Sequence, residues 1–182
     1  LPPSLTHLTF GSYFNQDVSV LPLNITHLIF GFDFNKDVSN LPPSITHLTF
    51  RYYFNQDVSK LPSNITHLVL GCCFNQQYII PSNIKYLRLD CNNEHMINNL
   101  PNSVTELELG YNFYLRMDNL PTSIKKLQIY KNSNYNVDLN CLPDFIEELY
   151  LNMNYKKRIL YIPSNLKKIV CHKDYPHIND FV

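Results

Sequence analysis

The sequence predicts a β-solenoid, in which short coils of chain stack on one another and each contributes one strand to a parallel sheet. A proline recurs every 19 to 22 residues along nearly the whole chain, and the same pattern of apolar residues follows each proline. A unit this short cannot bury its own apolar face, so each unit, hereafter a rung, must stack on its neighbours. The recurring prolines are Pro2, Pro22, Pro42, Pro62, Pro81, Pro101, Pro121, Pro143 and Pro163. We expect about nine rungs and an elongated molecule on the order of 40 Å in length.

Each rung carries the strand signature L-x-x-L-x-L of leucine-rich repeats. Apolar residues stand three, six and eight positions after the proline, as in Ile45, Leu48 and Phe50. The last two are separated by the two-residue period of a β-strand, so both face the core and the residue between them faces outward. The proline suits the corner before the strand, because it fixes φ and cannot donate a backbone hydrogen bond. The first four rungs are near-copies, whereas the rungs after Pro81 diverge.

The return leg of each rung should complete the core. Aromatic residues recur twelve positions after the proline and predict a stacked spine with gaps at Asn93 and Ser133. The spine residues are Phe14, Phe34, Phe54, Phe74, Phe113 and Tyr155. A second apolar column should close the rungs: Val18, Val38, Val58, Tyr78, Ile97, Met117, Val137 and Ile159. Alanine, the best helix former, is absent, so we expect little α-helix.

The 182 residues read as one domain, because the repeats cross any midpoint. We expect the solenoid to occupy residues 1–171 and a C-terminal tail or partial cap to follow at 172–182. Fifteen basic residues balance fifteen acidic ones, which argues against nucleic acid or a membrane surface as a partner. The chain starts within a unit and has no initiator methionine, so we interpret it as a fragment that a leading domain could precede.

The five cysteines do not form a disulfide framework, because their number is odd and their spacing irregular. Cys72 and Cys91 both stand ten residues after their prolines and should lie on adjacent rungs. Neighbouring strands are about 4.8 Å apart, a separation that a disulfide tolerates. We favour reduced thiols for this pair and expect Cys171, at a core position, to be buried.

The segments LPPSITHLTF and FNQDV resemble the FNIP repeat, also called the IP22 repeat, of social amoebae and giant amoeba-infecting viruses. The resemblance extends from Leu1 to about Cys171 and implies a fold of the leucine-rich-repeat kind. In place of a proline common in that family, this chain has Asp17, Asp37 and Asp57. With reduced thiols, we expect a cytoplasmic protein, in the host cytoplasm if viral. Its implied role is the substrate-recognition part of an F-box ubiquitin-ligase adaptor whose F-box lies outside this chain.

Histidine stands five positions after the proline in the first four rungs, on the outward strand face: His7, His27, His47 and His67. This column could be a metal-binding or pH-sensing ladder, or one harmless histidine copied by duplication. We favour a ladder without metal, because its histidines lie in a line whereas zinc requires tetrahedral convergence. Stacked like charges should keep the ladder largely neutral. The column continues with Tyr86, Glu106, Lys126, Glu148 and Lys168, whose alternating charges predict a self-neutralised face.

Apolar and aromatic residues on an open sheet face suggest a protein-binding patch. Its expected members are His27, Ile29, His47, Thr49, His67, Val69, Tyr86 and Arg88, hereafter the strand-face patch. No catalytic motif is present in the sequence, and we expect neither an enzyme nor a cofactor or metal site. The expected function is therefore a non-catalytic protein-interaction module. Two alternatives are a structural or assembly scaffold that self-associates through uncapped solenoid ends, and carbohydrate binding through tyrosine- and asparagine-rich edges.

Overall fold

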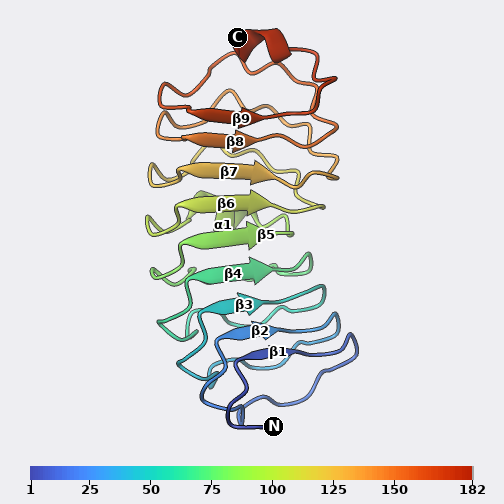
Figure 1. The fold of residues 1–182 in the computed structure, drawn as a ribbon, viewed down its shortest axis with the longest axis vertical. Coiled ribbons are helices and arrows are strands. Elements are labelled where there is room, and N and C mark those ends of the chain that lie inside the picture. The colour runs from blue at the N-terminus through green and yellow to red at the C-terminus, as the bar shows by residue number, and fades with distance from the viewer. Residues whose placement is uncertain (182) are drawn as a thin grey trace.

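The computed structural model describes residues 1–181 as one elongated stack of rungs, with the two ends of the chain at opposite ends of the stack (Figure 1). In these residues nine short strands form one parallel sheet in chain order. They are β1 (His7–Thr9), β2 (His27–Ile29), β3 (His47–Thr49), β4 (His67–Leu70), β5 (Tyr86–Leu89), β6 (Glu106–Leu109), β7 (Lys126–Ile129), β8 (Glu148–Tyr150) and β9 (Lys168–Val170). The β-solenoid of about nine rungs is confirmed.

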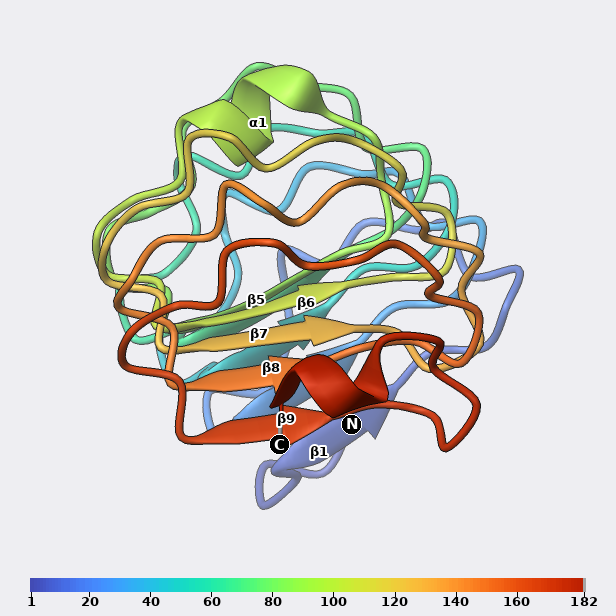
Figure 2. The same ribbon diagram turned by 90° about the horizontal axis from the view of Figure 1, so that it is seen from above.

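Equivalent residues pair across every junction of the sheet, so matched side chains lie in continuous rows. Leu68 pairs with Leu87 although the rung between their prolines has 19 residues. Leu127 pairs with Leu149 although that rung has 22 residues. The differences in length are therefore absorbed by the return legs, which lie opposite the strands when the stack is viewed along its axis (Figure 2).

The expected aromatic spine is confirmed in the first four rungs, where its phenylalanines stack in order. A second phenylalanine column, from the ends of the strands, packs against it. Phe30 stacks on Phe34 of its own rung at a ring-centroid distance of 3.7 Å, and Phe34 stacks on Phe54 of the next rung at 6.1 Å. Burial of each such ring contributes roughly 1.5–3 kcal/mol relative to exposure. These paired columns give the first half of the core an aromatic centre, which buried leucine, isoleucine and valine side chains surround.

The two expected gaps in the spine are filled by residues further along the same rungs. Asn93 caps the short helix α1 (Glu94–Asn98) by accepting a hydrogen bond from the Met96 amide at 3.0 Å, and Met96 is buried. In the seventh rung, Ser133 is fully buried and Tyr135 supplies the aromatic ring, donating its hydroxyl to the Leu115 carbonyl at 3.2 Å. Together with a 3-10 turn, η1 (Ile178–Phe181), α1 is the helical content of the described residues.

Two side chains, Tyr78 and Cys171, are more exposed than expected, and the structure also gives the state of the cysteines. Tyr78 was expected in the core and is 40% exposed, while Ile80 is buried in that shorter rung. Cys171 is only half-buried, because no further rung covers it among the described residues. All five cysteines are free thiols, and burial raises the pKa of Cys91 to about 12.

The end of the chain continues the aromatic column beyond residue 171. Tyr175 is buried, its ring lies 6.1 Å from that of Tyr155 in a tilted arrangement, and its hydroxyl donates to the Lys157 carbonyl at 2.8 Å. Phe181 of η1 stacks on Tyr175 in turn. The division into a solenoid and a tail or partial cap stays a prediction, and its last residue, Val182, lies outside the described residues.

The aspartates that replace the family's proline have a structural role on the return leg. Asp17 accepts the backbone N–H of Ser19 at 2.8 Å, and Asp57 accepts that of Ser59 at 2.7 Å. An aspartate that bonds its own backbone two residues later stabilises a turn. The substitution therefore exchanges one turn-forming residue for another.

Candidate functional site

The structure brings the residues of the strand-face patch together on β2–β5. All eight are partly exposed and lie in two neighbouring columns, one of histidines ending at Tyr86 and one ending at Arg88. They therefore form a continuous surface, four strands wide, on the outward face of the sheet.

The histidine column is an ordered stack. Ring centroids of His7, His27, His47 and His67 follow one another at 4.2, 4.1 and 4.0 Å, with interplanar angles of 11–15°. Each imidazole Nδ1 lies 2.9 Å from the hydroxyl of the threonine before it. We name these eight residues, Thr6, Thr26, Thr46 and Thr66 with the four histidines, the Thr–His ladder.

Protonation of the two central histidines is disfavoured. Burial lowers the pKa of His27 and of His47, and the charges of neighbouring histidines lower both further. Within residues 1–181 no group of three or more histidine, cysteine, aspartate or glutamate side chains could hold a metal ion. The two central imidazoles of the ladder are thus favoured in the neutral form.

Above the ladder, an ion-pair network fixes the last two members of the strand-face patch. The Tyr86 hydroxyl donates to the buried Glu108 carboxylate at 2.5 Å. Burial is the main cause that raises the pKa of Tyr86, and this hydrogen bond raises it further. Arg88 pairs with Asp90 at 3.0 Å and with Glu108 at 3.2 Å. Its guanidinium carbon lies 5.0 Å from the centre of the Tyr130 ring. Arg88 is therefore held in place by two ion pairs and a cation–π contact.

An open pocket of about 410 Å³ lies beside this network. Four members of the strand-face patch line it: Thr49, Val69, Tyr86 and Arg88. The loops that follow β2 and β3 add Phe32, Arg51 and Tyr52. The rings of Phe32 and Tyr52 lie 6.4 Å apart and are 44% and 41% exposed. The guanidinium carbon of Arg51 lies 5.6 Å from the centre of the Phe32 ring. Aromatic and arginine side chains are typical anchors of protein interfaces.

The loop residues of this pocket are absent from the strand-face patch, yet the sequence contains a signal for them. In the first four rungs the flanking sequence is nearly identical, but the three residues after the last inward-facing position differ from rung to rung. They are GSY at 11–13, GFD at 31–33, RYY at 51–53 and GCC at 71–73. We name these segments the variable triplets. A Cβ on Gly71 would lie 1.7 Å from the Arg51 carbonyl oxygen, so glycine there provides room for the third rung.

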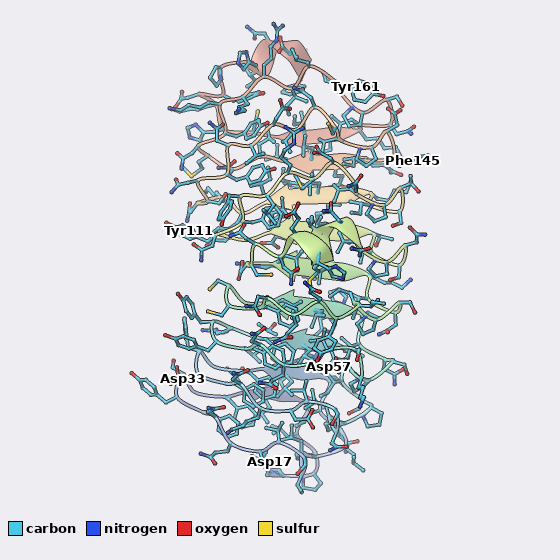
Figure 3. All side chains as sticks on the ribbon, turned by 180° about the vertical axis from the view of Figure 1, so that it is seen from behind. Asp17, Asp33, Asp57, Tyr111, Phe145 and Tyr161 are labelled. Atoms are coloured by element: carbon cyan, nitrogen blue, oxygen red, sulfur yellow. The ribbon has the colours of Figure 1, made fainter. Side chains whose placement is uncertain are left out.

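The outward face of the second half is self-neutralised, as the alternating column predicts. Lys126 pairs with Glu106 at 3.2 Å, and Lys167 pairs with Glu147 at 2.7 Å. Exposed aromatic residues instead occupy the two edges of the stack. Tyr111 projects from the edge that also carries Asp33, and Phe145 and Tyr161 project from the opposite edge (Figure 3).

The FNIP Repeat family profile matches residues 1–33, 17–53, 34–73 and 74–112. The chain belongs to the FNIP repeat family. Among solved structures, it is similar to CroV588 of a giant virus, described as a novel circular LRR protein structure, with 37% sequence identity and a TM-score of 0.76. The match covers 96% of this FNIP repeat chain and 28% of the CroV588 chain. No curated protein matches the chain.

The family and the leucine-rich-repeat-like fold are consistent with a non-catalytic interaction or scaffold module, and such repeat proteins are typically not enzymes. Among the described residues, no helix has the length and apolar character needed to span a bilayer.

Proposed function

We propose that this FNIP repeat chain binds a protein target, as the target-recognition arm of an F-box ubiquitin-ligase adaptor in the cytoplasm. The surface that binds is the strand-face patch together with Phe32, Arg51 and Tyr52, hereafter the docking face. The observation that carries the proposal is the pocket, in which aromatic and arginine side chains from the variable triplets meet the patch.

Two physical arguments support a protein partner. Interface cores are enriched in tyrosine, phenylalanine and arginine, and the docking face combines these residues around one hollow. The frame beneath is continuous with the aromatic core and has Arg88 fixed by ion pairs, so little conformational entropy is lost on binding. A rigid frame that carries different loop residues in each rung suits recognition better than a catalytic cleft.

The test replaces the third triplet with the first. Arg51→Gly with Tyr52→Ser changes RYY to GSY, a sequence that the first rung already contains at the equivalent positions. We expect the double variant to remain folded and to bind captured partners at least about tenfold more weakly, since loss of a central arginine or tyrosine costs about 2 kcal/mol or more.

The matched control is Lys60→Asn, which gives the third rung the residue of the second at a distant corner. Affinity capture from host-cell lysate, followed by measurement of Kd for each captured protein, compares the variants. Equal Kd values for the wild type and the triplet variant would refute the docking face. The adaptor role further requires that the full-length protein co-purify with ubiquitin-ligase subunits, and an F-box-free full-length sequence would contradict it.

A second candidate function is a structural scaffold, and the likeness to CroV588 favours it. That protein is described as circular, and this chain matches 28% of it, so rungs of this type can continue into a longer stack. Within the described residues, β1 and β9 each pair with one strand and leave one sheet edge open. Light scattering at increasing concentration tests this role, because self-association through the ends must raise the mean mass, and a constant monomer mass would contradict it.

A further inference from the structure

The hydrogen bonds of the Thr–His ladder determine where its protons lie. The Thr26 hydroxyl donates to the Thr6 carbonyl, and the Thr46 hydroxyl donates to the Thr26 carbonyl, each at 3.2 Å. A hydroxyl has one hydrogen, so these two can only accept from the imidazole Nδ1 that lies 2.9 Å away. The outer two rungs repeat the same Thr–His contact. The neutral rings of His27 and His47 therefore carry hydrogen on Nδ1, and their Nε2 is the nitrogen that takes up a proton on acidification.

Within residues 1–181, no carboxylate is placed to neutralise a protonated ladder. Its flanking columns are uncharged, with the ladder threonines on one side and Thr9, Ile29, Thr49 and Val69 on the other. The next rung brings Tyr86 and Arg88 on β5 and Lys85 just before it, and the nearby Glu108 is already held by Tyr86 and Arg88. The lowered pKa values of His27 and His47 arise from burial and from other histidines. Each added proton thus meets the repulsion of its neighbours without compensation.

We propose that the Thr–His ladder is a proton-gated docking strip that binds an acidic protein segment when the solution is acidified. The inference rests on the proposed protein-binding role of the docking face and names a partner chemistry for it. At neutral pH the central imidazoles of the strip, His27 and His47, are favoured in the neutral form. Protonation places up to four positive charges in a row, and carboxylates can then accept charge-assisted hydrogen bonds from Nε2–H.

The surroundings of the ladder favour a peptide over a nucleic acid. The column beside the histidines contains Ile29 and Val69, which suit apolar side chains that alternate with acidic ones. The chain as a whole has no basic excess for a phosphate backbone. Because the acidic segment binds the protonated ladder, it must raise the proton affinity of the ladder in return. Its affinity should rise about tenfold per pH unit for each proton taken up.

The experiment measures binding of a fluorescein-labelled peptide of alternating aspartate and valine, by fluorescence anisotropy at pH 7.5, 6.5 and 5.5 and constant ionic strength. We expect affinity to rise at least tenfold over this range. The triple variant H27Q/H47Q/H67Q should lose the rise. The matched control H95Q/H172Q/H177Q, which removes the three histidines outside the ladder, should retain it. A pH-independent affinity, or an equal rise in the ladder variant, would overturn the proposal. So would an oligothymidylate of the same charge that bound equally well.

A second measurement examines the ladder without any ligand. Imidazole nitrogen chemical shifts at pH 8 should show hydrogen on Nδ1 in His27 and His47, and hydrogen on Nε2 in these two rings would overturn the proposal. The two proposals fail separately. If the peptide does not bind but partner capture at pH 7.5 is intact, only the proposal for the ladder is refuted. If the peptide binds but the triplet replacement leaves partner capture unchanged, only the proposal for the pocket is refuted.

Discussion

The two halves of the sheet carry different outward side chains on the same frame. Across β1–β4 the column of imidazoles stacks at 4.0–4.2 Å on copies of itself. Across β6–β9 the same column reads Glu106, Lys126, Glu148 and Lys168, and its charges pair with neighbours of opposite sign at 3.2 and 3.8 Å. The inward leucines are the same in both halves.

This difference shows which residues a stack of rungs can repeat. A neutral side chain can recur in a column because it packs against its own copy. A charged one cannot, because like charges on neighbouring strands repel, so signs alternate wherever the column is charged. Duplicated rungs therefore stay neutral on their outward strand face, and diverged rungs can take up charge only in complementary pairs.

The largest expected effect is in the core, where the two halves should behave alike. Phe54→Ala should lower the free energy of unfolding by about 3–5 kcal/mol, because a fully buried ring leaves a cavity. Leu127→Ala in the second half should cost about 2–5 kcal/mol for the same reason. Urea unfolding followed by circular dichroism measures both. The control Phe32→Ala, at an exposed ring, should cost far less, and a cost equal to that of Phe54→Ala would contradict the aromatic core.

A smaller effect should separate the halves. Lys126→Glu places three like charges in a row with Glu106 and Glu148 and should cost about 1 kcal/mol of stability. His47→Glu puts the same charge between neutral rings and should cost less. Added salt should reduce the effect of Lys126→Glu, because exposed charges are screened. Equal, salt-independent costs at the two sites would show that charge alternation is not what distinguishes the halves.

Acidification should destabilise the first half through the ladder. The pKa values of His27 and His47 are lowered in the folded chain, so the unfolded chain binds protons first as pH falls through about 6.5. The stability that these neutral rings contribute is complete above that pH and is lost below it. The melting temperature of the wild type should therefore fall more between pH 7.5 and 5.5 than that of H27Q/H47Q/H67Q. Parallel melting curves would mean that the ladder pKa values are not lowered.

The smallest effect concerns the junction between the halves, where Cys72 and Cys91 lie on adjacent rungs. Both are free, and burial raises the pKa of Cys91 to about 12. The Cys91 thiol should react with an aromatic disulfide reagent more than about tenfold slower than the exposed Cys141, since thiolate is the reactive form. Mass spectrometry of peptides after timed labelling assigns a rate to each cysteine. If neither Cys72 nor Cys91 reacted, a disulfide between them would be indicated instead.

The fold follows from the sequence because a fixed period brings equivalent apolar residues to the same position in every rung, where only the interior of the stack can bury them. The filling of the spine at Asn93 and Ser133 does not, because Met96 and Tyr135 lie off the twelve-residue offset and reach the core only through a local helix or a shifted turn. The sequence predicts only some of the residues that line the pocket. Strand alternation identified Thr49, Val69, Tyr86 and Arg88, but it says nothing about the loop after the strand, where Phe32, Arg51 and Tyr52 project. The differences between otherwise copied rungs mark those positions.

Site-specific photo-crosslinking tests the docking face most directly. A benzophenone amino acid replaces either Tyr52, in the pocket, or Tyr161, on the opposite edge of the stack; their exposures are similar, at 41% and 46%. Irradiation in host cells, followed by mass spectrometry of the adducts, compares the two positions. We expect a specific protein adduct at residue 52 and none at residue 161, and the reverse result would contradict the docking face.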